Sequence, residues 1–64
     1  MSNILTKQDF DKIIFAYYCE HYGAKNTDEW LEAPAANVRI FVRDGKYITL
    51  KSHILTGEIE KFVE

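Results

Sequence analysis

Cysteine is almost absent from this sequence, since Cys19 is the single one among 64 residues. One cysteine excludes an internal disulfide framework, on which many small secreted domains depend. Long hydrophobic runs are also missing, because no stretch approaches the roughly 18 apolar residues that indicate a membrane span. The segment from Met1 to Phe10 is polar and lacks the pattern of a secretory signal. These absences predict a cytoplasmic protein that does not enter a membrane.

Motifs for catalysis and cofactor binding are missing as well. The chain has no glycine-rich phosphate loop and no HExxH, CxxC or EF-hand spacing. Cys19 and His21 are two residues apart, and on a helix such side chains point about 200° apart, so the two cannot share a metal ion. Cys19 with His53 stays open as a catalytic pair, although so small a domain has little room for a pocket beside its core. We expect no enzymatic activity, no cofactor and no metal site.

Apolar residues are abundant, in contrast, at 47% of the chain, and aromatic residues make up 14%. This composition excludes a disordered tail and predicts one small globular domain over residues 1–64. The aromatic supply exceeds what one small core needs, which is the first indication of a binding surface.

The first predicted element is a long N-terminal helix. Thr6 has the side chain of a helix N-cap, and Asp9 stands three residues later, at the spacing of a capping box. Apolar residues then follow the helical period as far as Tyr22, and Gly23 is a typical residue just after a helix end. We therefore expect a helix from Thr6 to about Tyr22.

Two shorter helices are predicted further along. Asn26 and Thr27 are good caps for a helix of about two turns, which Pro34 would end. Thr56 is a possible cap for a C-terminal helix that reaches Val63. The pattern does not decide whether residues 52–55 extend a strand or begin this last helix.

A β-hairpin lies between these helices. Residues 38–43 and 46–51 favour strands, and Asp44-Gly45 between them suits a two-residue type I′ turn. This turn pairs Val42 with Tyr47 and Ile40 with Thr49. One face then carries Val38, Ile40, Val42, Tyr47 and Thr49, and we expect it to pack on the core. The other face carries Phe41, Ile48 and Leu50 with Arg39, Arg43 and Lys46. The element order predicts a small α+β domain, ααββα.

The apolar arc of the first helix is unusually wide. It spans about 200°, whereas a surface helix needs a stripe of about 100° or a little more. Phe15, Tyr18 and Tyr22 form its outer edge. If the helix were buried centrally, this edge would be core. The functional interpretation is that the three rings meet another protein, because aromatic residues are favoured at interface centres.

The hairpin concentrates positive charge. Residues 38–51 hold Arg39, Arg43, Lys46 and Lys51 against Asp44, although the formal net charge of the chain is −2. The run RIFVRDGKYITLKSHIL resembles the wing of winged-helix DNA-binding domains and of small phage excisionases. This resemblance implies a DNA contact through the hairpin. Residues 24–37 depart from it, since they offer one lysine and no arginine where a recognition helix normally brings several cations.

The leading functional hypothesis is a small acidic protein-interaction module that binds and modulates, or inhibits, a larger protein partner. Compact acidic proteins of this size are often encoded by phages or mobile elements as inhibitors of host machinery. A homodimer through the helix edge is a second outcome of the same hypothesis. The alternative is a winged-helix-like DNA-binding regulator that uses the basic hairpin.

Overall fold

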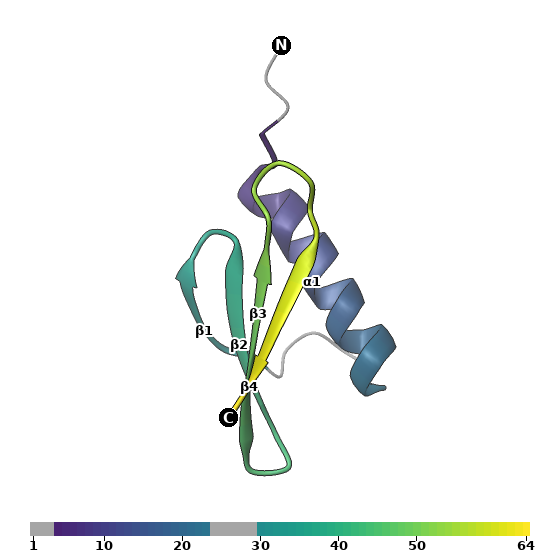
Figure 1. Ribbon diagram of the computed structural model, residues 1–64, viewed down its shortest axis with the longest axis vertical. Helices are drawn as coiled ribbons and strands as arrows, with labels where there is room; N and C mark the ends of the chain where they lie inside the picture. Colours follow the sequence, from purple (N-terminus) through teal and green to yellow (C-terminus); the bar gives the residue numbers. More distant parts are fainter. Residues whose placement is uncertain (1–3, 24–29) are drawn as a thin grey trace.

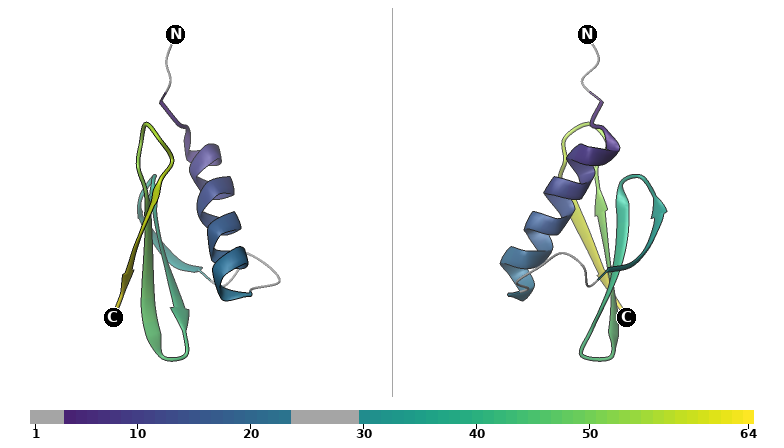
Figure 2. Two further views of the ribbon diagram at one scale, coloured as in Figure 1. Left: turned by 45° about the vertical axis from the view of Figure 1, so that its right-hand side comes forward. Right: turned by 180° about the vertical axis from the view of Figure 1, so that it is seen from behind.

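One helix and a four-stranded antiparallel sheet make up the described part of the chain (Figure 1). The computed structural model describes residues 4–23 and 30–64. The sheet is a meander with the strand order β1-β2-β3-β4, and α1 lies across one of its faces (Figure 2). The α+β class is thereby confirmed. The elements are α1 (Lys7–Tyr22), β1 (Trp30–Ala35), β2 (Val38–Arg43), β3 (Lys46–Ser52) and β4 (Ile59–Val63).

Both ends of α1 agree with the sequence prediction. Thr6 caps the helix, and its hydroxyl accepts the Asp9 N–H at 3.2 Å. The Asp9 carboxylate in turn accepts the Thr6 N–H at 2.8 Å, which completes the capping box. This backbone hydrogen bond is the main reason that the pKa of Asp9 lies below its ordinary value. Gly23 ends the helix in the left-handed conformation, with φ of 67°.

The β2–β3 hairpin also has the predicted register. Val42 pairs with Tyr47, and Ile40 pairs with Thr49. Asp44 and Gly45 have φ values of 54° and 75°, the two positive angles that a type I′ turn requires.

Gly45→Ala should destabilise the fold by about 1 kcal/mol. A Cβ at this position would meet no atom within 4 Å, so the cost comes from the positive φ alone. In a thermal melt, this loss corresponds to a decrease in Tm of about 4–8 °C for a domain of this size. Gly45→Asn is the matched control, since asparagine tolerates positive φ better than alanine and should lose less. An unchanged Tm for Gly45→Ala would contradict this account of the turn.

The predicted second helix is wrong where the structure describes it. Its proposed caps lie outside the described residues, but Trp30–Ala35 forms the edge strand β1. Trp30 pairs with Phe41 across the sheet, and the β1–β2 register shifts twice before Ala35. Pro34, which was expected to end a helix, is tolerated here because an edge strand can accommodate a residue without an N–H.

The predicted C-terminal helix is wrong as well. Ile59–Val63 forms β4, which pairs with β3 from Ser52↔Ile59 to Ile48↔Val63. Ser52 is the last residue of β3, which settles the ambiguity over residues 52–55. Thr56 lies in the β3–β4 loop, where its hydroxyl accepts the Glu58 N–H at 3.3 Å. The described order is therefore αββββ instead of ααββα.

The buried face of the sheet is the opposite of the one predicted. Phe41, Ile48 and Leu50 face α1 and are almost completely buried. The helix contributes Phe10, Ile14 and Tyr18 to the same core. The hairpin register does not determine this choice, because both faces are apolar at their centres. Arg39, on the buried face, finds its counter-charge on α1, as described below.

Candidate interaction surfaces

The predicted partner-binding rings of α1 lie between the helix and the sheet. Tyr18 is 0% exposed and stacks on Phe41, with the ring centroids 3.9 Å apart. It also stacks on Tyr22 at 5.1 Å. Phe15 is half-buried and meets Phe41 and Trp30 edge-on, at 5.7 and 6.0 Å. For Tyr18 the sequence interpretation is therefore corrected, since a side chain with no exposed surface offers nothing to a partner.

Tyr22 lies at the end of the helix and is half-buried. The Lys61 Nζ of β4 is 5.9 Å from the centre of its ring, within the range of a cation–π contact. The sheet therefore covers a wide part of the apolar arc of α1, because Trp30, Phe41 and Lys61 contact its outer rings. An interface role for Phe15 and Tyr22 stays a prediction.

Arg39, the first cation of the predicted nucleic-acid surface, is a buried structural residue. Its side chain is 1% exposed, and its guanidinium forms an ion pair with Asp11 of α1. The Nε–H donates to the Asp11 carboxylate at 3.1 Å, and Nη2 contacts the same oxygen. Nη1 donates to the carbonyls of Ala36 and Val38 at 2.8 Å each, and to that of Ala35 at 3.2 Å. Arg39 is thus withdrawn from any phosphate contact, which corrects the sequence interpretation.

The other three hairpin cations do not share a surface. Arg43 and Lys46 pair at the turn end of the hairpin, in phase with Phe41 and Ile48, on the helix side. Lys51 pairs with Val38 and points to the opposite side. A duplex that contacted the first two cations would therefore not reach the third from the same face. The basic hairpin is a weaker DNA surface than its sequence indicates.

The sheet face opposite α1 is covered by no described element (Figure 2). Val42, Tyr47 and Phe62 on this face are 39%, 56% and 51% exposed. Phe62 belongs to it because it pairs with Thr49. This is the face that the sequence interpretation assigned to the core. We call it the open face, and its members are Val38, Ile40, Val42, Tyr47, Thr49 and Phe62.

Charged residues border the open face, and most of them are acidic. Glu32 pairs with Ile40 at the β1 edge, and Glu60 pairs with Lys51 at the β4 edge. Glu64 extends this edge, since its N–H donates to the Tyr47 carbonyl at 2.9 Å. Three carboxylates and one ammonium group therefore surround an apolar centre.

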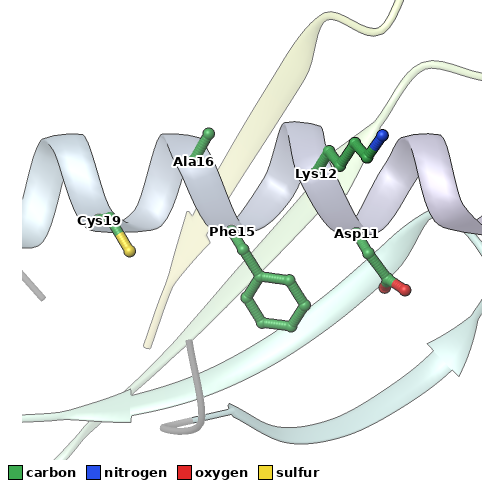
Figure 3. A pocket seen from close by; sticks show the side chains of 5 residues that line it. All are labelled: Asp11, Lys12, Phe15, Ala16 and Cys19. Carbon is green, nitrogen blue, oxygen red and sulfur yellow. The ribbon is translucent and has the colours of Figure 1, made fainter. Parts of the chain in front are cut away.

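A shallow hollow of about 400 Å³ runs along α1 (Figure 3). The Phe15 and Cys19 side chains point to its sheet side, and Lys12 and Ala16 lie on the other side. His53 lies in the β3–β4 loop, where its Nδ1 accepts the Leu55 N–H at 3.2 Å. That loop packs beside the first turns of α1, whereas Cys19 is near the end of the helix (Figure 1). The structure thus separates the two members of the possible catalytic pair.

Within residues 4–23 and 30–64, no three histidine, cysteine, aspartate or glutamate side chains form a group that could hold a metal ion. No helix in the same ranges is long and apolar enough to cross a membrane. Comparisons with protein families, curated proteins and solved structures found no match for this chain.

Proposed function

We propose that this protein is a non-enzymatic binding module, which engages a larger protein through the open face and modulates it. The observation that supports the proposal is the exposure of Tyr47, Phe62 and Val42 together on one sheet face. Large contiguous apolar surfaces on soluble domains usually mark interaction sites. Tyrosine and phenylalanine are also suited to interface centres, because they bury much area and lose few torsional degrees of freedom.

The rim of the open face indicates the chemistry of the partner. Glu32, Glu60 and Glu64 surround the apolar centre, and Lys51 is directly opposite Glu60. A complementary partner has an apolar patch bordered by lysine or arginine. Like-charge contacts at the rim would disfavour acidic partners. Inhibition follows where the patch on the partner is also the surface with which it acts or assembles.

Alanine at Tyr47 or Phe62 should weaken the complex while leaving the monomer folded. Removing a central aromatic anchor costs about 2 kcal/mol or more of binding, which is roughly a 30-fold loss of affinity. The partner is first captured from a lysate and identified by mass spectrometry. Its Kd is then measured with each variant by calorimetry, and thermal melts test whether the variants stay folded.

Leu55→Ala is the matched control for these variants. Leu55 is 58% exposed, similar to Tyr47, but it lies in the β3–β4 loop away from the open face. It should leave the Kd unchanged within about twofold, as expected for a residue outside the interface. A captured partner that is insensitive to both open-face variants would contradict the proposal. Light scattering measures the oligomeric state and so tests for a homodimer. If the unaltered protein is a dimer and Tyr47→Ala is a monomer, the open face binds a second copy of this chain instead of a different protein.

A further inference from the structure

The outer edge of β4 presents unpaired backbone groups in a regular phase. His53 N–H donates to the Glu58 carbonyl at 2.8 Å, and Tyr47 N–H donates to the Glu64 carbonyl at 3.1 Å. Hydrogen-bonded pairs alternate with non-bonded pairs along an antiparallel ladder, so Glu60 and Phe62 also bond to β3. The residues that alternate with these bonded ones therefore direct their N–H and C=O groups away from β3. They are Ile59, Lys61 and Val63. No described strand lies on that side.

The two edges of the sheet differ in how they are protected. At the β1 edge, Pro34 removes a donor and two register shifts interrupt the ladder. Proline and bulges of this kind are devices that prevent strand addition. At the β4 edge, Ile59–Val63 contains no proline, and its pairing with β3 has no shift. The β4 edge lacks these two devices, and the charges of Glu60 and Lys61 restrict which strand can add there.

We propose that β4 accepts an extended segment of the partner protein as a fifth, antiparallel strand. In strand addition of this type, main-chain hydrogen bonds give affinity and alternate side chains give specificity. This inference rests on the proposed function, because it names the segment of the partner that the module takes. The β4 edge shares Glu60 and Phe62 with the open face but does not include Tyr47, so variants of Tyr47 test the two claims separately.

Charge argues against a second copy of β4 as the added strand. When two copies of β4 pair antiparallel through their free edges, one residue faces its own copy. Registers that pair at least three residues of each strand place Glu60, Lys61 or Phe62 at this central position. The first two place Glu60 opposite Glu60 and Lys61 opposite Lys61. The third places Glu60 opposite Glu64. Like charges directly opposite each other destabilise a strand pair, so each register is disfavoured. The fitting occupant is a segment of different sequence.

The side chains of β4 specify the chemistry of that segment. Lys61 pairs with Leu50 on the helix side, whereas Glu60 and Phe62 point to the open face. A complementary strand therefore has an acidic residue opposite Lys61, a basic one opposite Glu60 and an apolar one opposite Phe62. In antiparallel orientation, the segment reads apolar–acidic–basic from its N-terminus.

A hollow beside Val63 extends this pattern by one residue. It has a volume of about 230 Å³ and lies on the helix side of the sheet, at the turn end of the hairpin. Its lining includes the apolar Ile48, the cations Arg43 and Lys46, and Asp44. A glutamate opposite Val63 would place its methylenes on the apolar wall and its carboxylate near the cations. The complete segment is then Glu-Val-Asp-Lys-Val, running from the position opposite Val63 to the one opposite Ile59.

This five-residue peptide, acetylated and amidated, is the probe for the test. It is titrated to millimolar concentration into the full 64-residue chain while the amide signals are followed by NMR. We expect saturable shifts at β4 and slower hydrogen exchange of the Ile59, Lys61 and Val63 amides. The peptide Lys-Val-Lys-Glu-Val reverses the charges and should bind at least about tenfold more weakly, as several mismatched cross-strand pairs accumulate.

Backbone methylation separates strand addition from contact by side chains. N-methylation of the aspartate removes an N–H that faces β4, and should weaken binding about tenfold. N-methylation of the first valine alters an N–H that faces away and should change the affinity by less than about twofold. Equal effects at the two sites, or no saturable shift at millimolar peptide, would overturn the inference.

Two protein variants complete the experiment. Lys61→Pro removes one outward N–H that β3 does not use, so the fold should persist while peptide binding is lost. Lys61→Gln keeps this N–H and should weaken binding only about threefold. If Lys61→Pro fails to fold, the methylated peptides give the same answer on the unaltered protein. Peptide binding in Tyr47→Ala should be unchanged, so failure of the strand addition is distinguishable from failure of the open-face proposal.

Discussion

Tyr18→Ala should remove most of the free energy of unfolding of this protein. The Tyr18 ring is completely buried and stacks between Phe41 and Tyr22, so its removal opens a cavity where helix and sheet meet. Truncations of large buried aromatic residues cost about 3–5 kcal/mol. Whole domains are stable by about 5–15 kcal/mol, and a chain of this size belongs near the lower limit. Urea titration followed by circular dichroism measures the loss.

Phe10→Ala and Tyr47→Ala are the two reference variants for Tyr18→Ala, one in the core and one at the surface. Phe10 is 4% exposed in the same core, so its truncation should be comparably damaging. Tyr47 is an aromatic residue of the open face, more than half exposed, and its truncation should cost less than about 1 kcal/mol. If Tyr18→Ala resembled Tyr47→Ala, the ring would lie at the surface, and the helix edge would again become the better candidate for partner binding.

The parts of the fold that the sequence predicted are those encoded by neighbouring residues. Thr6 and Asp9 specify the start of α1 through hydrogen bonds between residues three positions apart, and Gly23 specifies its end. Asp44-Gly45 specifies both the turn and the register of β2 with β3. These signals need no knowledge of the remaining chain, because each depends on local backbone geometry.

The edge strands β1 and β4 were missed because their stabilising contacts are remote or ambiguous. Ile59, Phe62 and Val63 have a spacing that fits a helix face, and Thr56 is a good cap. Pairing with β3 overrides this weak local preference, since Glu60 and Phe62 join a ladder that is already present. For β1, Trp30 packs near Phe15 and pairs with Phe41, which the local sequence around residue 30 does not reveal.

The candidate site depends on which face of the hairpin is buried, and one long-range pair allows the face that carries Arg39 to be buried. Arg39 and Asp11 are 28 residues apart in the chain. Arginine is mostly an exposed residue, and Arg39 shares its face with Arg43 and Lys46, so the sequence predicts that this face is the exposed and basic one. Once Asp11 neutralises it, the Arg39 face can be covered by α1 and the other apolar face is left open. The sequence shows that the apolar arc of α1 is wide, but not that the arc packs against the sheet.

Arg39→Ala should be about as destabilising as a core truncation. Five donor–acceptor contacts connect this guanidinium to Asp11 and to the carbonyls of Ala35, Ala36 and Val38. Removing one partner of a buried ion pair costs about 3–5 kcal/mol, because the remaining groups lose their compensation. Asp11 is 40% exposed and water can solvate it, so the lower end of this range is expected. Urea unfolding gives the loss directly.

Substitutions by other residues separate the charge of Arg39 from its geometry. Arg39→Lys should rescue only part of the loss, since one ammonium group cannot reproduce the planar fork that reaches Asp11 and the carbonyls together. Lys51→Ala removes an exposed cation of the same hairpin and should change the free energy of unfolding by less than about 0.5 kcal/mol.

The DNA-binding alternative makes the opposite prediction. On a phosphate-binding surface, Arg39→Ala would keep its Tm and lose affinity for duplex DNA in a salt-dependent manner. An Arg39→Ala variant with an unchanged Tm and that loss of affinity would restore the hairpin as the functional surface. A strongly destabilised variant leaves the open face and the β4 edge as the candidates.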